Sequence, residues 1–203
     1  MKRLAISDIR LGWLERFCSV ARHRNIVKAS QECNVDPTSV SDSIQKLEDA
    51  LCRPLMAPAT AYVPAFGRRF VHDAERILRI SVISPHPLTN VSISWFYALV
   101  AISESNSYVE AGDSLGWKRY KVMRGVSELE SWVGSQLVFS RTAIRLTLKG
   151  EEVLPAAREI ISILEGLRGS PEIWYGGRRR PRKVPWWLRT FGPAEFSNRR
   201  GKR

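Results

Sequence analysis

Cysteine and histidine are scarce in this chain, which contains three of each among 203 residues. Cys18, Cys33 and Cys52 are odd in number and widely spaced. This favours reduced thiols inside a cytosolic protein over a disulfide framework. The histidines make no ligand-like spacing with the cysteines. We therefore expect neither a metal ion nor a cofactor.

A long hydrophobic run is also missing. The longest one, residues 95–102, is far too short to cross a bilayer. The first eight residues, MKRLAISD, have no apolar core of the length that a signal peptide needs. These two absences lead us to expect a cytoplasmic protein that has no membrane partner.

The usual catalytic arrangements are absent as well. The sequence has no Ser/His/Asp arrangement, no phosphate-binding glycine-rich motif and no cluster of metal ligands. It also has no pair of carboxylates in a plausible pocket. We therefore expect no enzymatic activity.

Acidic residues are in the minority. There are 20 Asp and Glu against 32 Lys and Arg, which gives a net charge of +12. Such a balance favours a polyanionic partner, either a nucleic acid or an anionic membrane surface. The excess is uneven: residues 1–84 carry +4, residues 85–168 carry zero and residues 169–203 carry +8.

The sequence resembles itself when its later part is aligned with its beginning. The identical pairs include Ala29 with Ala111, Val40 with Val122, Leu47 with Leu129, Glu48 with Glu130 and Leu55 with Leu137, all at one constant shift. Apolar positions keep the same phase without a gap, and after one inserted residue Gly67 matches Gly150. A short hairpin tolerates such an insertion. We interpret the pattern as a duplicated domain.

Each copy has the periodicity of a small helical domain. In the first copy, apolar spacing predicts helices at 9–21 and just after Asn25, and a third helix that begins with Asp36 as N-cap and Pro37. Two short strands around Pro58, within residues 55–63, and a fourth helix near Gly67 follow. In the second copy we predict helices at 93–104, 107–115, 118–133 and 149–167, with a hairpin at 137–147.

This element order is that of the winged helix-turn-helix. We predict a mainly α fold with small β wings, made of two tandem winged helix-turn-helix domains and a basic C-terminal tail. The domains span residues 8–84 and 88–168, each including a linker helix, and the tail spans 169–203. Pro85 and Pro87 mark the boundary between the domains because proline ends a helix. A small helical domain without a ligand is the alternative.

Residues 13–78 resemble the DNA-binding domain of LysR-type transcriptional regulators. The resemblance rests on residues 14–21 (LERFCSVA), 25–30 (NIVKAS) and 41–48 (SDSIQKLE). In the second copy it rests on Ala111, Val122, Arg124, Val126 and Leu129-Glu130, and on residues 137–141 (LVFSR) and 146–150 (LTLKG). It implies a helix-turn-helix that binds double-stranded DNA on the bacterial nucleoid.

The chain departs from the family in one respect. A LysR regulator carries one such domain followed by a two-lobed ligand-sensing domain, whereas here a second copy stands in that place. The family's small-molecule coinducer is therefore not carried over. In the family, linker helices of two subunits pair. Here helices 66–82 and 150–167 either pair within the chain as a pseudo-dimer or pack only within their own copy. A homodimer of two chains is equally open.

Basic side chains crowd the third helix and the wing of the second copy. They are Lys118, Arg119, Lys121 and Arg124 on the helix, and Arg141 and Arg145 on the wing. Arg119 and Arg124 suit guanine edges, and the others suit phosphates. A solvated basic helix face is the alternative.

The third helix of the first copy is polar rather than basic. Its expected exposed face offers Thr38, Ser39, Ser41, Asp42, Ser43 and Gln45. Asp42 would repel phosphate, although it could accept a hydrogen bond from cytosine. Arg68 and Arg69 partly replace the arginines that the wing lacks. We expect the second copy to bind DNA more tightly than the first.

The tail contains a dense arginine run, Arg178, Arg179 and Arg180, followed by Trp186 and Trp187. The run is either an arm that binds the DNA backbone or a solvated segment. The tryptophans would dock on the protein's own domains or on another protein such as RNA polymerase.

These features lead to a sequence-specific transcriptional regulator with two non-equivalent DNA-binding units. The alternative is an architectural or mobile-element accessory protein that acts in excision, partition or DNA bridging.

Overall fold

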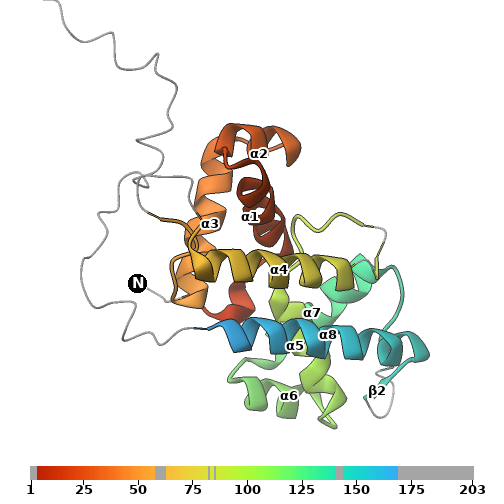
Figure 1. The fold of residues 1–203 in the computed structure, drawn as a ribbon. Helices are drawn as coiled ribbons and strands as arrows, with labels where there is room; N and C mark the ends of the chain where they lie inside the picture. The colour runs from red at the N-terminus through yellow and green to blue at the C-terminus, as the bar shows by residue number, and fades with distance from the viewer. Residues whose placement is uncertain (1–3, 58–62, 82, 85, 140–143, 169–203) are drawn as a thin grey trace, which may run out of the picture.

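The computed structural model of the protein describes residues 4–57, 63–81, 83–84, 86–139 and 144–168 (Figure 1). The described chain is mostly helical. A short 3-10 helix, η1 (Ile6–Asp8), is followed by α1 (Leu11–His23), α2 (Ile26–Glu32), α3 (Pro37–Leu51) and α4 (Ala65–Ile80). The second half contains α5 (Ile93–Ser103), α6 (Tyr108–Leu115), α7 (Arg119–Val133), β1 (Val138–Phe139), β2 (Arg145–Leu146) and α8 (Leu148–Leu167). We call residues 4–84 the first half and residues 86–168 the second half.

Side-chain caps fix where most of these helices begin. The Asp36 carboxylate accepts from the amide of Ser39 at 3.0 Å, and Pro37 is the first residue of α3, as the sequence predicts. Equivalent bonds join Asn25 to the amide of Lys28, Ser107 to that of Glu110 and Thr147 to that of Gly150. The predicted helix positions are therefore correct to within about two residues.

Left-handed residues end the helices at matching places in the two halves. Asn34 has φ 52° between α2 and α3, and Gly116 has φ 62° between α6 and α7. Cys52 and Gly134 take the same conformation directly after α3 and α7. The two members of each pair are related by the shift that aligns the copies in the sequence.

A carboxylate and a glycine organise the chain after α3 and after α7. Glu48 accepts from the amides of Leu55 and Met56, and Glu130 accepts from those of Leu137 and Val138. At the next helix, a Cβ on Gly67 would lie 2.3 Å from the carbonyl oxygen of Leu55, and one on Gly150 would lie 2.2 Å from that of Leu137. Only glycine permits these close approaches.

The two wings differ in the described residues. β1 and β2 form an antiparallel pair in which Phe139 lies opposite Arg145, so the predicted second hairpin is present. In the first half, residues 55–57 form no strand, and residues 58–62 lie outside the described residues. The prediction of two short strands across 55–63 is thus not confirmed.

Each half has its own aromatic centre. In the first, the rings of Phe17 and Phe70 lie 5.2 Å apart and both side chains are fully buried. In the second, Phe96 meets Trp132 edge-on at 6.1 Å. Phe66 is only half-buried. Cys18 and Cys52 are buried free thiols, and Cys33 is half-buried.

The two halves are joined by a short backbone ladder. The amide of Leu11 donates to the carbonyl of Val91 at 2.9 Å, and the amide of Ile93 donates to that of Ile9 at 2.8 Å. Arg10 and Ser92 form an isolated antiparallel bridge between these bonds. The shift that aligns the copies relates Leu11 to Ile93 and Ile9 to Val91, so each bond is the counterpart of the other.

Helices α4 and α8 run antiparallel along the same face of the molecule (Figure 1). The Arg76 guanidinium of α4 pairs with the Glu159 carboxylate of α8. Both halves thus contribute their last helix to one contact. No helix in the described part of the chain is long and apolar enough to span a membrane.

Candidate nucleic-acid interface

Helix α7 presents one buried and one exposed face. The buried face carries Val122, Val126 and Leu129 into the core of the second half. The exposed face begins with Lys118, which is the N-cap of the helix and makes no side-chain capping bond. A helix that leaves one full face to solvent has the geometry required to enter a major groove.

The two arginines on the exposed face of α7 differ in whether they form an ion pair. Arg119 is exposed and forms no ion pair within the described residues. Arg124 lies one turn further on, and its Nε is 3.3 Å from a carboxylate oxygen of Glu128, with 78% of the side chain exposed. Exposed pairs of this kind are weak, so Arg124 can exchange Glu128 for another acceptor at little cost.

Lys121 is less available than the sequence suggests. Its ammonium group lies 3.7 Å from the centroid of the Trp117 ring, in the turn that precedes α7. This cation–π contact holds the side chain against the protein. A phosphate contact by Lys121 would have to be made from that position.

The wing supplies one described cation. Arg145 on β2 is exposed. Arg141 lies outside the described residues, as do Arg178, Arg179, Arg180, Trp186 and Trp187.

In the first half, two of the serines predicted to be exposed are buried. Ser41 is 0% and Ser43 is 2% exposed. The Ser41 hydroxyl donates to the carbonyl of Pro37 at 2.8 Å, and that of Ser43 donates to the carbonyl of Ser39 at 2.7 Å. Arg16 also donates to the Ser43 hydroxyl. The expectation of exposure was wrong for both, and neither has surface left for a DNA contact.

The remaining polar side chains of α3 keep some accessible surface. Thr38 and Asp42 are exposed, whereas Ser39 and Gln45 are half-buried. The Ser39 hydroxyl donates to the Asp36 carboxylate, and this bond with the backbone cap lowers the pKa of Asp36. Of these four side chains, the exposed ones therefore offer one hydroxyl and one carboxylate.

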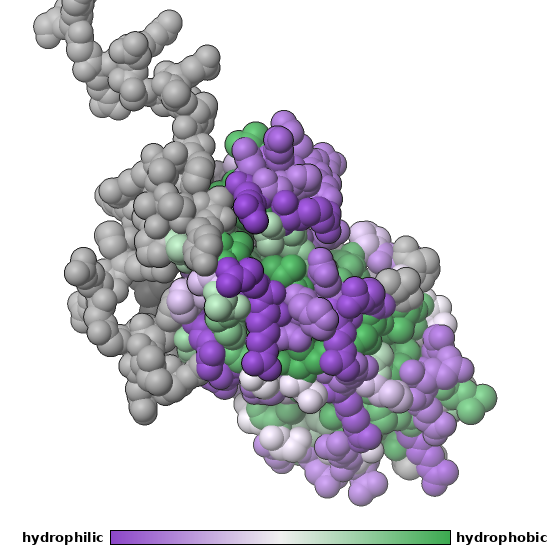
Figure 2. Space-filling view, in the orientation of Figure 1, coloured by the Kyte–Doolittle hydropathy of each residue, from purple (hydrophilic) through white to green (hydrophobic). Residues whose placement is uncertain are grey.

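The two α4 cations predicted to contact DNA, Arg68 and Arg69, lie at the start of that helix. Arg68 donates to the carbonyl of Val63 at 3.1 Å, and Arg69 is exposed. Figure 2 shows the face formed by α4 and α8, on which polar and apolar surface are mixed.

Two exposed apolar residues of α7 were not singled out from the sequence. Tyr120 is 67% and Met123 is 42% exposed. Residue type alone does not predict this exposure, because aromatic and thioether side chains are ordinarily found in the core. Their mismatch with the buried phase of α7 is the signal that would have identified them.

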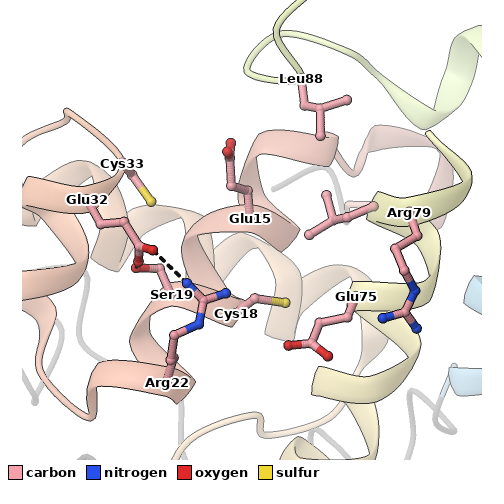
Figure 3. Close-up of a pocket in the computed structure, with 10 residues that line it drawn as sticks. Glu15, Cys18, Ser19, Arg22, Glu32, Cys33, Glu75, Arg79 and Leu88 are labelled. Carbon is pink, nitrogen blue, oxygen red and sulfur yellow. Dashed lines mark hydrogen bonds and ion pairs between the residues drawn. The ribbon is translucent and has the colours of Figure 1, made fainter. Parts of the chain in front are cut away.

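A cleft lies in the first half, away from the residues considered so far. Its volume is about 450 Å³, and it is bordered by α1, α2 and α4 and by Leu88 (Figure 3). Within it, Glu32 accepts hydrogen bonds from Ser19 and Arg22, which lower the pKa of Glu32.

Neither thiol that lines this cleft, Cys18 or Cys33, is activated, and burial raises the pKa of Cys33. Burial, followed by the nearby Glu75 carboxylate, raises the pKa of Cys18 to about 12. A nucleophilic cysteine requires the opposite shift. Among the described residues no group of three or more His, Cys, Asp or Glu side chains could hold a metal ion.

A family model matches within the first half. Residues 11–61, which include α1, α2 and α3, match the family described as bacterial regulatory helix-turn-helix protein, lysR family. Over 81 residues the chain is 32% identical to the HTH-type transcriptional regulator PtxR of Pseudomonas aeruginosa, which is 39% of this chain and 26% of that protein. The chain thus spans about a quarter of the length of that relative. No solved structure gives a significant match. Residues 11–61 are therefore similar to the helix-turn-helix DNA-binding domain of LysR-type regulators.

Proposed function

We propose that this protein is a sequence-specific transcriptional regulator in which the LysR-type helix-turn-helix of residues 11–61 is accompanied by a second DNA-binding unit in residues 88–168. The match of residues 11–61 to the family is the observation that carries the proposal. Regulators with this domain act by binding double-stranded DNA, which agrees with the net charge of +12.

The repeated local geometry supports a second unit. The left-handed residues after α3 and α7, the carboxylates of Glu48 and Glu130, and the close approaches at Gly67 and Gly150 recur at nearly constant separation. These recurring features are backbone conformations, hydrogen bonds and close contacts, and they are not similarities of amino-acid composition. They support a duplication of the domain, with units at residues 8–84 and 88–168.

The contacts between the halves support a pseudo-dimer within one chain. A two-fold rotation relating the halves would exchange the bonds of Leu11 to Val91 and of Ile93 to Ile9. Arg76 and Glu159 likewise occupy equivalent positions once the one inserted residue of the second copy is allowed for. A single chain would then present two recognition helices to two half-sites about one helical turn, or a multiple of it, apart.

The two units are not equivalent in this proposal. Helix α7 carries the exposed Arg119 and Arg124, whereas α3 carries the exposed Asp42 and buries Ser41. The second unit would therefore supply most of the guanine and phosphate contacts. The bound site would consist of two dissimilar half-sites rather than a palindrome.

The proposal contains no small-molecule effector. The segment that follows the first unit has the helix order of a second helix-turn-helix rather than that of a two-lobed sensor. The arginines and tryptophans of residues 178–187 would add backbone affinity or a contact with RNA polymerase.

The test is selection of DNA from a random pool with the intact protein, repeated with Arg119→Ala and Arg124→Ala combined. We expect a two-part motif whose second part is lost in the double variant. Arg79→Ala combined with Arg158→Ala, on α4 and α8, removes the same charge and should keep the motif. Binding without any motif would instead indicate an architectural protein and would refute sequence-specific regulation.

A further inference from the structure

The exposed apolar side chains are distributed unevenly between the halves. Six large apolar side chains are exposed in the described part of the chain, and five of them lie in the second half. They are Val109 on α6, Tyr120 and Met123 on α7, Phe139 on β1 and Leu148 on α8; Val27 on α2 is the sixth.

Tyr120 and Met123 share the outward face of α7. They are three positions apart, and Arg124 is four positions from Tyr120, so the three side chains lie side by side along the helix. The buried positions of α7 lie on the other face. Within the described residues, the Tyr120 side chain makes no hydrogen bond and no ring contact. It contributes little to the core, with 67% of it exposed.

The equivalent face of α3 is different. Thr38 occupies the position of Tyr120, and Ser41, which is buried, occupies that of Met123. Asp42 stands in place of Arg124. The apolar pair is thus a property of the second unit alone, and it is bordered by cations that would bring it close to DNA.

Apolar side chains have one specific use in the major groove. The thymine 5-methyl group is the apolar element of the base edges there, and apolar side chains read it by contact. An aromatic ring beside an arginine can cover a methyl group while the arginine binds a neighbouring guanine.

We propose that Tyr120 and Met123 are specificity-determining residues that read thymine 5-methyl groups in the half-site of the second unit. This inference rests on the proposed function. It identifies a methyl contact next to the guanine contacts of Arg119 and Arg124.

The test uses the DNA site selected with the intact protein. Each thymine of that site is replaced in turn by deoxyuridine, which removes only the methyl group, and the Kd of each duplex is measured. At one or two positions in the second half-site we expect affinity to fall about fourfold, the factor for withdrawing one methyl group from apolar contact. Replacements in the first half-site should have a smaller effect.

The variants assign the methyl contact to these side chains. With Tyr120→Ala and Met123→Ala combined, the thymine and deoxyuridine duplexes should bind equally. Tyr120→Phe should keep the preference, since the ring rather than the hydroxyl makes the contact. Val109→Ala removes another exposed apolar side chain, from α6, and should also keep it. An unchanged Tm would show that each variant is folded.

The outcomes separate this inference from the proposed function. A selected motif without methyl dependence, or methyl dependence that survives the Tyr120 and Met123 changes, would overturn the methyl contact and leave the regulator proposal standing. Failure to select any motif would overturn both.

Discussion

Glu48 is a charged side chain with only 3% of its surface exposed. One of its carboxylate oxygens accepts from the amides of Leu55, at 2.9 Å, and Met56, at 3.2 Å. Glu130 does the same for Leu137 and Val138 in the second half. At this scale the fold depends on carboxylate acceptors, buried in Glu48 and half-buried in Glu130, that satisfy backbone amides after α3 and after α7.

We predict that Glu48→Ala lowers the free energy of unfolding by about 2–4 kcal/mol, because two buried amides lose their acceptor. Glu48→Gln keeps a carbonyl oxygen in place and should lose less than half as much. Urea denaturation measures both. Equal losses of unfolding free energy in the two variants would show that the charge of Glu48, and not its acceptor oxygen, stabilises the fold.

The Cys18 thiol offers a second test at the residue scale. Because burial raises its pKa to about 12, we expect iodoacetamide to leave Cys18 unmodified at pH 8 in the folded protein. In denaturant, all three cysteines should react. Mass spectrometry of peptides gives the site of each modification, and rapid labelling of Cys18 in the native state would contradict the burial.

The burial of some single side chains could not be predicted from the sequence. Serine is ordinarily expected at the surface, but Ser41 and Ser43 meet their hydrogen-bonding needs within α3 and can therefore be buried. Tyr120 is the reverse case, an aromatic residue outside the core. Periodicity reveals neither the hydrogen bonds that allow the two serines to be buried nor the exposure of Tyr120.

Helix α8 illustrates how an element is positioned. Its two glycines, Gly150 and Gly166, have opposite surroundings: a Cβ on Gly150 would meet the backbone of Leu137, whereas one on Gly166 would meet nothing within 4 Å. The first glycine allows the helix to approach the chain that precedes β1. The second has no such role.

We predict that Gly150→Ala destabilises the protein, because the backbone of Leu137 would have to move. Gly166→Ala should be neutral or stabilise by at most about 1 kcal/mol, the difference in helix propensity. Thermal unfolding of the pair provides an internally controlled comparison. A similar loss in both would contradict the contact with Leu137 as the cause, because Gly166 has no such contact.

The starts of helices could be predicted from the sequence, whereas the contacts between distant segments could not. Helix starts were found because their caps are local: Asp36 bonds a residue three positions away. The ladder of Leu11 and Ile93 was not predicted, since it joins segments from opposite halves of the sequence through backbone atoms, which carry no pattern. The contact of α4 with α8 remained one of two open alternatives, because an apolar stripe does not say which partner covers it.

The arrangement of the whole molecule depends on how the halves meet. Gly12 lies at this contact, where a Cβ would be 2.7 Å from the carbonyl oxygen of Thr89. Alanine there favours helix α1 but disturbs the junction. The junction, in the proposed function, fixes the distance between the two recognition helices.

We predict that inserting five base pairs between the half-sites, about half a helical turn, weakens binding more than inserting ten, about one full turn. Gly12→Ala should reduce this dependence on phase by loosening the junction. Gly166→Ala is the matched control and should retain it. If the unaltered protein bound the sites with and without inserted base pairs equally well, the two halves would act independently.

The bridge between Arg10 and Ser92 connects two parts of one polypeptide. Two separate subunits that met through the same contact would dissociate as the protein became dilute, whereas a covalent connection keeps the local concentration of each half constant. In the proposed function, occupancy of a two-part site would therefore rise with the first power of protein concentration, even when a cell holds only a few copies.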